Sequence, residues 1–295
     1  MSTFVRPAST AGAIAATIAL GAIAMVAMSS PVVAASLYSN GFETNLTDWD
    51  AFGGGLDATR VASGTNGVTS ASGGFHAENS ASGSASRWGG YNFGAGNAVP
   101  TAFQEYTTSV DIYLNVAGGW ANDTRFDFDS AINKADGTFM RDFIFNAGFY
   151  NAADVTGPGA GTNRFVISAS NNSQPGSAFA KNPGKSPISI DVSGWYTFQH
   201  HFYNDAGVLA VDMNILDSSD SLVATWTLSD ISDLISGTGG NRYGWFDDNQ
   251  FSVLAFDNAS LDTVDAPEPT SMALLGAGLF GLGMLRRRLR LAKRD

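Results

Sequence analysis

The chain has 295 residues, of which 34 are Gly and none is Cys, and 44% are apolar while only 15% are charged. This composition excludes a disordered protein, a collagen, a disulfide-stapled miniprotein and a polytopic membrane protein, and the lack of Cys excludes thiolate metal sites and Cys nucleophiles. Residues 36–265 hold nine Lys and Arg against 25 Asp and Glu, a net charge of −16. Because nucleic-acid binding requires a basic surface, we expect no nucleic-acid partner.

The first 35 residues are typical of a signal peptide. Arg6 supplies the positive start, residues 11–28 form a continuous run of small apolar residues, and a Ser-Ser-Pro sequence ends it. Val32 and Ala34 are the small residues that signal peptidase requires, so we predict an N-terminal signal helix and cleavage after Ala34 or Ala35. An uncleaved membrane anchor is the alternative.

Residues 36–265 predict an all-β body. Apolar and polar residues alternate over 208–216, as in a half-buried strand. Residues 195–203 precede this strand across an Asn-Asp-Ala-Gly turn, which indicates a hairpin. The other segments with strand character are 107–114, 125–128, 139–149, 164–168, 222–227 and 251–261, and the apolar spacing over 228–235 predicts a short helical turn. Short strands separated by Gly, Asn and Ser turns favour one antiparallel β-sandwich of the jelly-roll type.

The last 30 residues combine three features in a fixed order. Pro267, Glu268 and Pro269 come first, then the apolar residues 272–285, and then the basic residues Arg286, Arg287, Arg288 and Arg290. As a helix, the apolar segment is about 21 Å long, which is shorter than the bilayer core of about 30 Å, so we predict a marginally inserted transmembrane helix. The Arg cluster would stop transfer and hold the C-terminus in the cytoplasm.

This three-part order resembles the PEP-CTERM sorting signal of Gram-negative bacteria. The resemblance implies that residues 266–295 are a sorting signal and that an exosortase-type membrane protease processes the exported chain. It also implies delivery to the cell envelope, the outer surface or the extracellular matrix. Because this family is associated with exopolysaccharide and biofilm, exopolysaccharide is an expected partner. An ordinary C-terminal tail anchor is the alternative.

The two ends of the body resemble carbohydrate-binding jelly rolls. Residues 40–43, Asn-Gly-Phe-Glu, look like the opening of such a module, and residues 256–261 look like its closing strand. The resemblance implies that the first and last strands are adjacent and that a structural Ca²⁺ lies near them. Glu43 and Asp257 are then candidate calcium ligands, since Ca²⁺ prefers oxygen ligands; alternatively, Asp257 is exposed or accepts backbone N–H groups. The region from Trp195 resembles concanavalin-like lectin domains, another jelly roll.

A second candidate ligand site is the segment that contains Asn241, Arg242 and Trp245. It resembles a segment of other proteins that carry this sorting signal. An exposed Trp could stack on a sugar ring while the Asn and Arg side chains form hydrogen bonds to it. The alternative is that Trp245 anchors a long loop to the core.

Motifs of known enzymes are missing from the sequence. It contains no Gly-x-Ser-x-Gly, Walker, dinucleotide-binding or His-Glu-x-x-His pattern. His200 and His201 are neighbours on a strand, so they point to opposite faces and are expected to be structural. Asp127 and Asp129 share one strand face and could act as the carboxylate pair of a glycosidase, although a solvated strand face is the alternative.

We therefore expect no catalytic residues and no certain cofactor. The first hypothesis is an exported, non-catalytic surface or matrix protein whose body binds polysaccharide. The alternatives are a polysaccharide-active enzyme and a purely structural matrix component.

Overall fold

The structure is a computed structural model. It describes residues 34–47, 49–51, 58–80, 84–88, 102–171, 179–240 and 243–264, which cover most of the body. The predicted signal helix, the Pro-Glu-Pro motif, the predicted transmembrane helix and the Arg cluster lie outside these residues. Within the described residues, no helix has the length and apolar character needed to cross a membrane.

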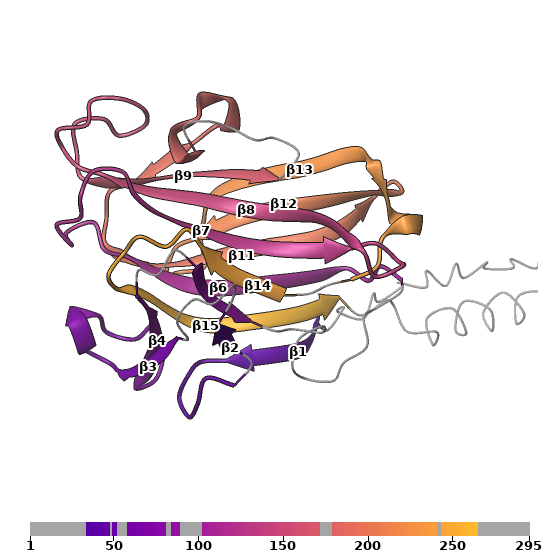
Figure 1. The fold of residues 1–295 in the computed structure, drawn as a ribbon, viewed down its shortest axis with the longest axis horizontal. Helices are drawn as coiled ribbons and strands as arrows, with labels where there is room; N and C mark the ends of the chain where they lie inside the picture. The colour runs from indigo at the N-terminus through magenta and orange to yellow at the C-terminus, as the bar shows by residue number, and fades with distance from the viewer. Residues whose placement is uncertain are drawn as a thin grey trace, which may run out of the picture. The chain divides into compact units, whose positions relative to one another are not determined.

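One sheet of the body has eight strands. Its order is β13-β12-β11-β6-β15-β4-β3, and β1 also pairs with β15 (Figure 1). The strands are β1 (Ala34–Asn40), β3 (Thr59–Ala62), β4 (Phe75–Asn79), β6 (Tyr106–Leu114), β11 (Gly194–Asp205), β12 (Val208–Leu216), β13 (Leu222–Leu234) and β15 (Leu254–Val264).

The other sheet has seven strands in the order β10-β9-β8-β7-β14-β5-β2. They are β2 (Trp49–Ala51), β5 (Ser84–Trp88), β7 (Thr124–Asn133), β8 (Phe139–Tyr150), β9 (Arg164–Asn171), β10 (Ile188–Ile190) and β14 (Tyr243–Asp247). Four single 3₁₀ turns complete the described elements: η1 (Thr65–Gly67), η2 (Phe179–Lys181), η3 (Pro183–Lys185) and η4 (Ile235–Gly237).

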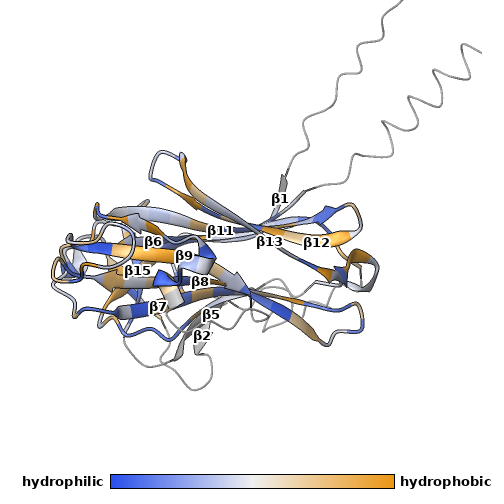
Figure 2. Cartoon of the chain, turned by 90° about the horizontal axis from the view of Figure 1, so that it is seen from above, coloured by the Kyte–Doolittle hydropathy of each residue, from blue (hydrophilic) through white to orange (hydrophobic). Residues whose placement is uncertain are grey.

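The two sheets pack face to face as two layers, which Figure 2 shows from above. Because side chains alternate along a strand, one set of them fills the space between the sheets, and this set is rich in aromatic residues. Phe145 of β8 meets Phe198 of β11 edge to face, with ring centroids 5.1 Å apart. Every strand pair in the described residues is antiparallel, so the predicted antiparallel β-sandwich is confirmed.

The connections place the two ends of the body side by side. β15 lies between β4 and β6 and also pairs with β1, from Ala34 opposite Val264 to Asn40 opposite Ala259. This is the adjacency of first and last strands that the jelly-roll resemblance implied. The chain passes repeatedly from one sheet to the other, as it does in jelly rolls.

One element differs from its prediction. Residues 228–234 are not helical, because β13 continues through Leu234, and Ile235 is the first residue of the 3₁₀ turn η4. The helical spacing counted Ile231 and Leu234 as core residues, but their exposed fractions are 87% and 53%. Without a buried stripe, the helical pattern has nothing to pack against, and pairing of the segment with β12 extends the strand instead.

Candidate functional site

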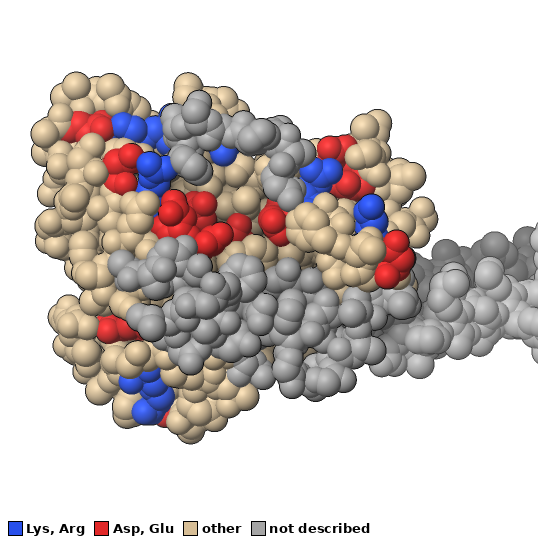
Figure 3. Space-filling view, in the orientation of Figure 1, with Lys and Arg blue, Asp and Glu red and all other residues tan. Residues whose placement is uncertain are grey.

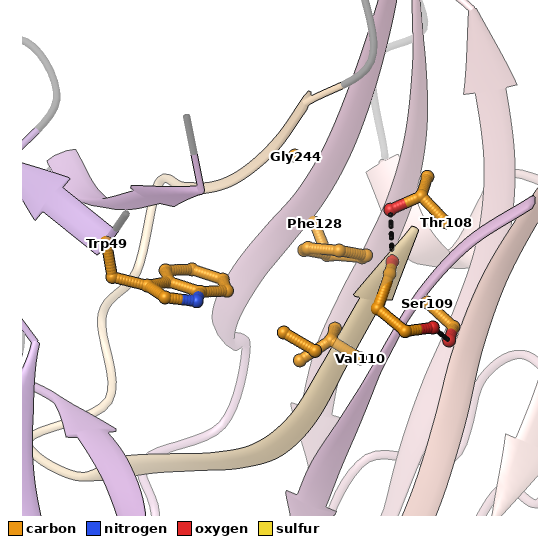
Figure 4. A pocket seen from close by; sticks show the side chains of 8 residues that line it. Trp49, Thr108, Ser109, Val110, Phe128 and Gly244 are labelled. Atoms are coloured by element: carbon orange, nitrogen blue, oxygen red, sulfur yellow. Dashed lines mark hydrogen bonds between the residues drawn. The ribbon is translucent and has the colours of Figure 1, made fainter. Parts of the chain in front are cut away.

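The interior of the sandwich is too tightly filled to bind a sugar. A void of about 10 Å³ lies between the sheets, which is room for about one water molecule. Figure 4 shows its lining, in which Trp49, Val110 and Phe128 meet, and the Thr108 hydroxyl donates to the carbonyl oxygen of Ser260 at 3.1 Å. This void is too small for a sugar, so a sugar that binds the described part of the body needs another site.

Acidic side chains gather on the outer face of the seven-stranded sheet. On β7, Phe126 and Phe128 point into the core, so the alternating Asp127 and Asp129 point outward. Asp247 of β14 lies directly opposite Asp127. Asp142 of β8 lies opposite Ala131, two residues beyond Asp129 on β7. It completes what we call the carboxylate face: Asp127, Asp129, Asp142 and Asp247. In Figure 3, acidic side chains cluster in the middle of the surface, over β7 and β8.

Polar side chains of the next two strands extend this face. Asn146 of β8 lies opposite Asp127 and donates its amide to Oδ1 at 2.9 Å. The amide oxygen of Asn146 accepts from the Ser170 hydroxyl of β9 at 2.7 Å and from the Lys185 ammonium group at 3.3 Å. The face therefore presents carboxylate, amide, hydroxyl and ammonium groups in neighbouring positions.

Burial shifts the acidity of these carboxyl groups. It raises the pKa of Asp127 to about 7, and the nearby Asp248 and Asp247 charges add to the shift while the Asn146 hydrogen bond opposes it. Burial, followed by the charge of Asp247, raises the pKa of Asp142 to about 6. At neutral pH, part of the face is protonated, so its carboxyl groups can donate as well as accept hydrogen bonds.

Asp129 is the most buried member of the carboxylate face. Its exposed fraction is 4%, and its Oδ2 atom has no hydrogen-bond partner. Burial and then the charges of Asp127, Asp142 and Asp247 raise its pKa. An unpaired buried acceptor is unusual, because burying it costs free energy that a hydrogen bond normally recovers.

The two candidate calcium ligands bind the same loop through backbone donors. Glu43 accepts the N–H groups of Gly74 and Phe75, while Asp257 Oδ2 accepts those of Ala71 and Ser72 at 3.1 and 3.2 Å. Within the described residues, no three His, Asp or Glu side chains are placed to hold a metal ion. Calcium binding by Glu43 and Asp257 stays a prediction that chelation and a melting curve can test.

Three side chains beside this loop, which no sequence motif indicated, form a hydrogen-bonded series: Ser70, His76 and Glu78. The Ser70 hydroxyl lies 3.0 Å from Nδ1 of His76, and Nε2 of His76 lies 3.3 Å from Oε1 of Glu78. The nucleophile, base and acid of a hydrolase have this order, but Asp257 occupies the N–H groups of residues 71 and 72, where an oxyanion would bind. His76 is fully buried, so we interpret the series as a structural support of the loop.

The described tryptophan side chains of the body, including the candidate Trp245, are buried or half-buried. Trp245 is buried, with 6% exposed, opposite Asp129 in the strand pairing, whereas Asn241 and Arg242 lie outside the described residues. Among the tryptophans whose side chains are described, Trp120 and Trp195 are half-buried and the others are buried. The described surface therefore offers no fully exposed indole ring as a stacking platform.

The adjacent histidines point to opposite faces, as predicted. His200 lies between the sheets against Phe145, with Nε2 3.1 Å from the carbonyl oxygen of Phe143, and burial lowers its pKa to about 3. His201 lies on the outer face, 3.0 Å from Glu105.

A loop depression forms the other candidate surface. It is lined by Asn122, Asn151, Ala153, Asp154, Val155 and Thr156. Asp154 is already paired with Lys181 at 2.7 Å and with Arg164 at 3.2 Å. The hydrogen bond from Lys181, followed by those from Thr156, holds the pKa of Asp154 well below the usual range. Since the acceptor is used inside the protein, the depression lacks the open carboxylates of the sheet face.

Comparisons with known proteins agree with the sequence at the C-terminus. Residues 265–288 match the PEP-CTERM protein-sorting motif, which marks the chain as an exported, envelope-associated protein. No curated protein matches the chain.

Solved structures with a similar arrangement include three β-rich proteins. One is the CBM2 module of the evolved Dit of Lactobacillus casei BL23 phage J-1, at 10% identity and a TM-score of 0.38, covering 79% of this chain and 97% of that one. A second is winged bean acidic lectin in complex with methyl-α-D-galactose, at 11% identity and a TM-score of 0.38. The match covers 79% of this chain and 99% of the lectin chain. A third is a protein of unknown function from Shewanella oneidensis MR-1, at 10% identity and a TM-score of 0.38. The match covers 80% of this chain and 90% of the Shewanella protein.

Proposed function

We propose that this protein is a non-catalytic component of the envelope or matrix of a Gram-negative bacterium and that its β-sandwich binds exopolysaccharide through the carboxylate face. The observation that carries the proposal is the row of hydrogen-bonding side chains across β14, β7, β8 and β9, with Asp247, Asp127 and Asn146 in register. Sugars present many hydroxyl groups, and carboxylate and amide oxygens are strong acceptors for them. The filled interior supports surface binding.

A glycan array with the full chain in detergent tests this proposal. We expect binding to polysaccharide from the native host and to a subset of the arrayed oligosaccharides. The Asn146→Ala variant should bind more weakly, because it removes the amide that links Asp127 to Ser170. A chain that binds no glycan, including the host polymer, would leave a purely structural matrix role as the better explanation.

Delivery depends on the sorting motif in this proposal. After signal peptidase acts, an exosortase-type protease recognises Pro267, Glu268 and Pro269, while the apolar segment of residues 272–285 and the Arg cluster hold the chain in the inner membrane. Replacing the three motif residues with Ala should leave unprocessed, membrane-bound protein. Mass spectrometry of the C-terminus checks this, and normal processing of the variant would refute the motif's role.

A second candidate function is polysaccharide cleavage. The observation that favours it is the pKa of Asp127, which burial raises to about 7, in the range useful for a general acid. Turnover of the host polysaccharide that is lost in both Asp127→Asn and Asp129→Asn would replace the binding proposal with an enzymatic one.

A further inference from the structure

Among the described side chains, the carboxylate face carries more negative charge than its neighbours balance. Asp247 and Asp127 lie directly opposite each other on neighbouring strands, an arrangement that is destabilising for like charges. Among the described residues, Lys185 is the cation whose charge acts on Asp127, and its ammonium group donates to Asn146, 3.3 Å away. The face would therefore gain stability from an added cation.

Asp129 supplies a second, independent observation. Its side chain points out of β7 into the group formed by Asp127, Asp142 and Asp247, yet only 4% of it is exposed and Oδ2 has no donor. A charged donor can reach this atom only when the side chains that cover it move aside, and it would then form a hydrogen bond worth more than a neutral one, because the site is shielded from water.

The chemistry of the face favours an organic cation over a metal ion. No set of three acidic or His side chains in the described ranges is arranged around one point, as a metal ion requires. A primary ammonium group does not need converging ligands, because a single carboxylate oxygen can accept one of its N–H groups in a charge-assisted hydrogen bond. The amide of Asn146 and the hydroxyl of Ser170 continue the face with groups that suit sugar hydroxyls.

We propose that the carboxylate face binds a polysaccharide of amino sugars that carry free ammonium groups, with Asp129 as the acceptor at its floor. This inference rests on the proposed function and narrows it to one class of polymer. The net charge of −16 over residues 36–265 acts in the same direction, since it attracts polycations and repels polymers of uronic acids.

Calorimetry with the full chain in detergent tests the inference. The ligands are hexamers of glucosamine, of N-acetylglucosamine, of glucose and of a uronic acid, with hexalysine as a cationic peptide. We expect the glucosamine hexamer to bind about tenfold more tightly than the two neutral hexamers, which is the worth of one charge-assisted hydrogen bond, and to weaken with added salt. The uronic acid hexamer should not bind.

The matched variants are Asp129→Asn and Asp191→Asn. Asp129→Asn keeps the shape of the side chain and should bind the glucosamine hexamer about tenfold more weakly. Asp191 is exposed and lies between β10 and β11, away from the face, so Asp191→Asn should bind normally. A melting curve of each variant confirms that it is folded before binding is compared.

The outcomes separate this inference from the function on which it rests. Equal affinity for charged and neutral hexamers, with no effect of Asp129→Asn, would overturn the amino-sugar inference and leave polysaccharide binding intact. Hexalysine binding as tightly as the glucosamine hexamer would overturn it in favour of a peptide ligand. Failure of every oligosaccharide, and of the host polymer, would overturn both.

Discussion

Asp129 illustrates at the residue scale how a binding group can lower stability. Its carboxyl group is buried beside Asp127 and Asp142 with one oxygen unpaired, so at neutral pH the folded state either holds a poorly solvated charge or binds a proton, and each costs free energy. Side chains that bind a ligand often lower the stability of the free protein in this way, because their hydrogen-bond partner is supplied only when the ligand binds.

Asp129→Asn should therefore make the protein more stable. The neutral amide removes the repulsion from Asp127 and Asp142 and costs less to bury than a carboxylate. We expect the melting temperature at neutral pH to rise by a few degrees, while Asp191→Asn leaves it unchanged. A lower melting temperature for Asp129→Asn would show that its carboxylate has a stabilising partner in the folded protein.

The series of Ser70, His76 and Glu78 gives a second prediction for single residues. Ser70→Ala leaves Nδ1 of the buried His76 without its partner, which should cost about 1–3 kcal/mol of the free energy of unfolding. Urea denaturation measures this cost. Thr69→Ser, at the neighbouring exposed position, is the control, and a neutral effect of Ser70→Ala would mean that the loop does not depend on the series.

The residue scale also shows where the sequence was insufficient. The spacing of His76 and Glu78, two apart on a strand, places them on one face and could have been read from the alternation. Ser70 could not, because a loop brings it back to His76. For Asp257, the sequence offered backbone N–H groups as the alternative to a calcium ion, and its side chain does accept them. The loop that supplies these donors, and those to Glu43, could not be found from the sequence.

Among the elements, strands with strict alternation were predictable and edge segments were not. The predicted range 208–216 is β12 itself, and the predicted turn closes the β11–β12 hairpin with Ala206 and Gly207 at positive φ. The continuation of β13 escaped prediction because its outer residues are exposed, so hydrophobic periodicity carried no information there. Ion pairs fix this part of β13, since Arg141 of β8 donates to Asp233 and Asp230 of β13.

Arg141 should therefore act as a link between the two sheets. Its Nε lies 2.6 Å from Oδ2 of Asp233, and both side chains are largely buried. Arg141→Leu leaves Asp233 buried without its partner, which should cost about 3–5 kcal/mol of the free energy of unfolding. Denaturant unfolding measures the cost, and Arg141→Leu combined with Asp233→Leu should recover most of it. No recovery in the double variant would mean that packing around Arg141, and not the ion pair, is responsible.

For the whole molecule, the acidic composition predicts an unusual pH dependence of stability. Burial raises the pKa of Asp127 to about 7 and those of Asp142 and Asp257 to about 6, whereas an unfolded Asp has a pKa of about 3.9. Between these values the folded state holds more protons than the unfolded state, so the free energy of unfolding falls as pH rises. The contribution of these three carboxyl groups to stability is fully present below the pKa of the unfolded state. It is lost as the pH rises through their pKa values in the folded protein.

His200 acts in the opposite direction over part of this range. Its pKa of about 3 in the folded protein lies below the unfolded value of about 6.5, so its contribution to stability is lost as pH falls through that interval. The effect of this one histidine opposes that of three carboxyl groups. Lowering the pH also reduces the repulsion among the acidic side chains of the body. The carboxyl groups should therefore dominate from about pH 7 down to about pH 5.

We expect the melting temperature to rise when the pH is lowered from about 8 to about 5, and to fall again only in stronger acid, where paired carboxylates such as Asp154 become protonated. Calorimetry across this range gives the measurement. Asp127→Asn should flatten the rise, because the variant no longer titrates at that position, while Asp191→Asn should preserve it. A melting temperature that rises with pH from 5 to 8 would show that the buried carboxyl groups of the sheet face remain ionised in the folded protein, and that the face is more open to water than its packing indicates.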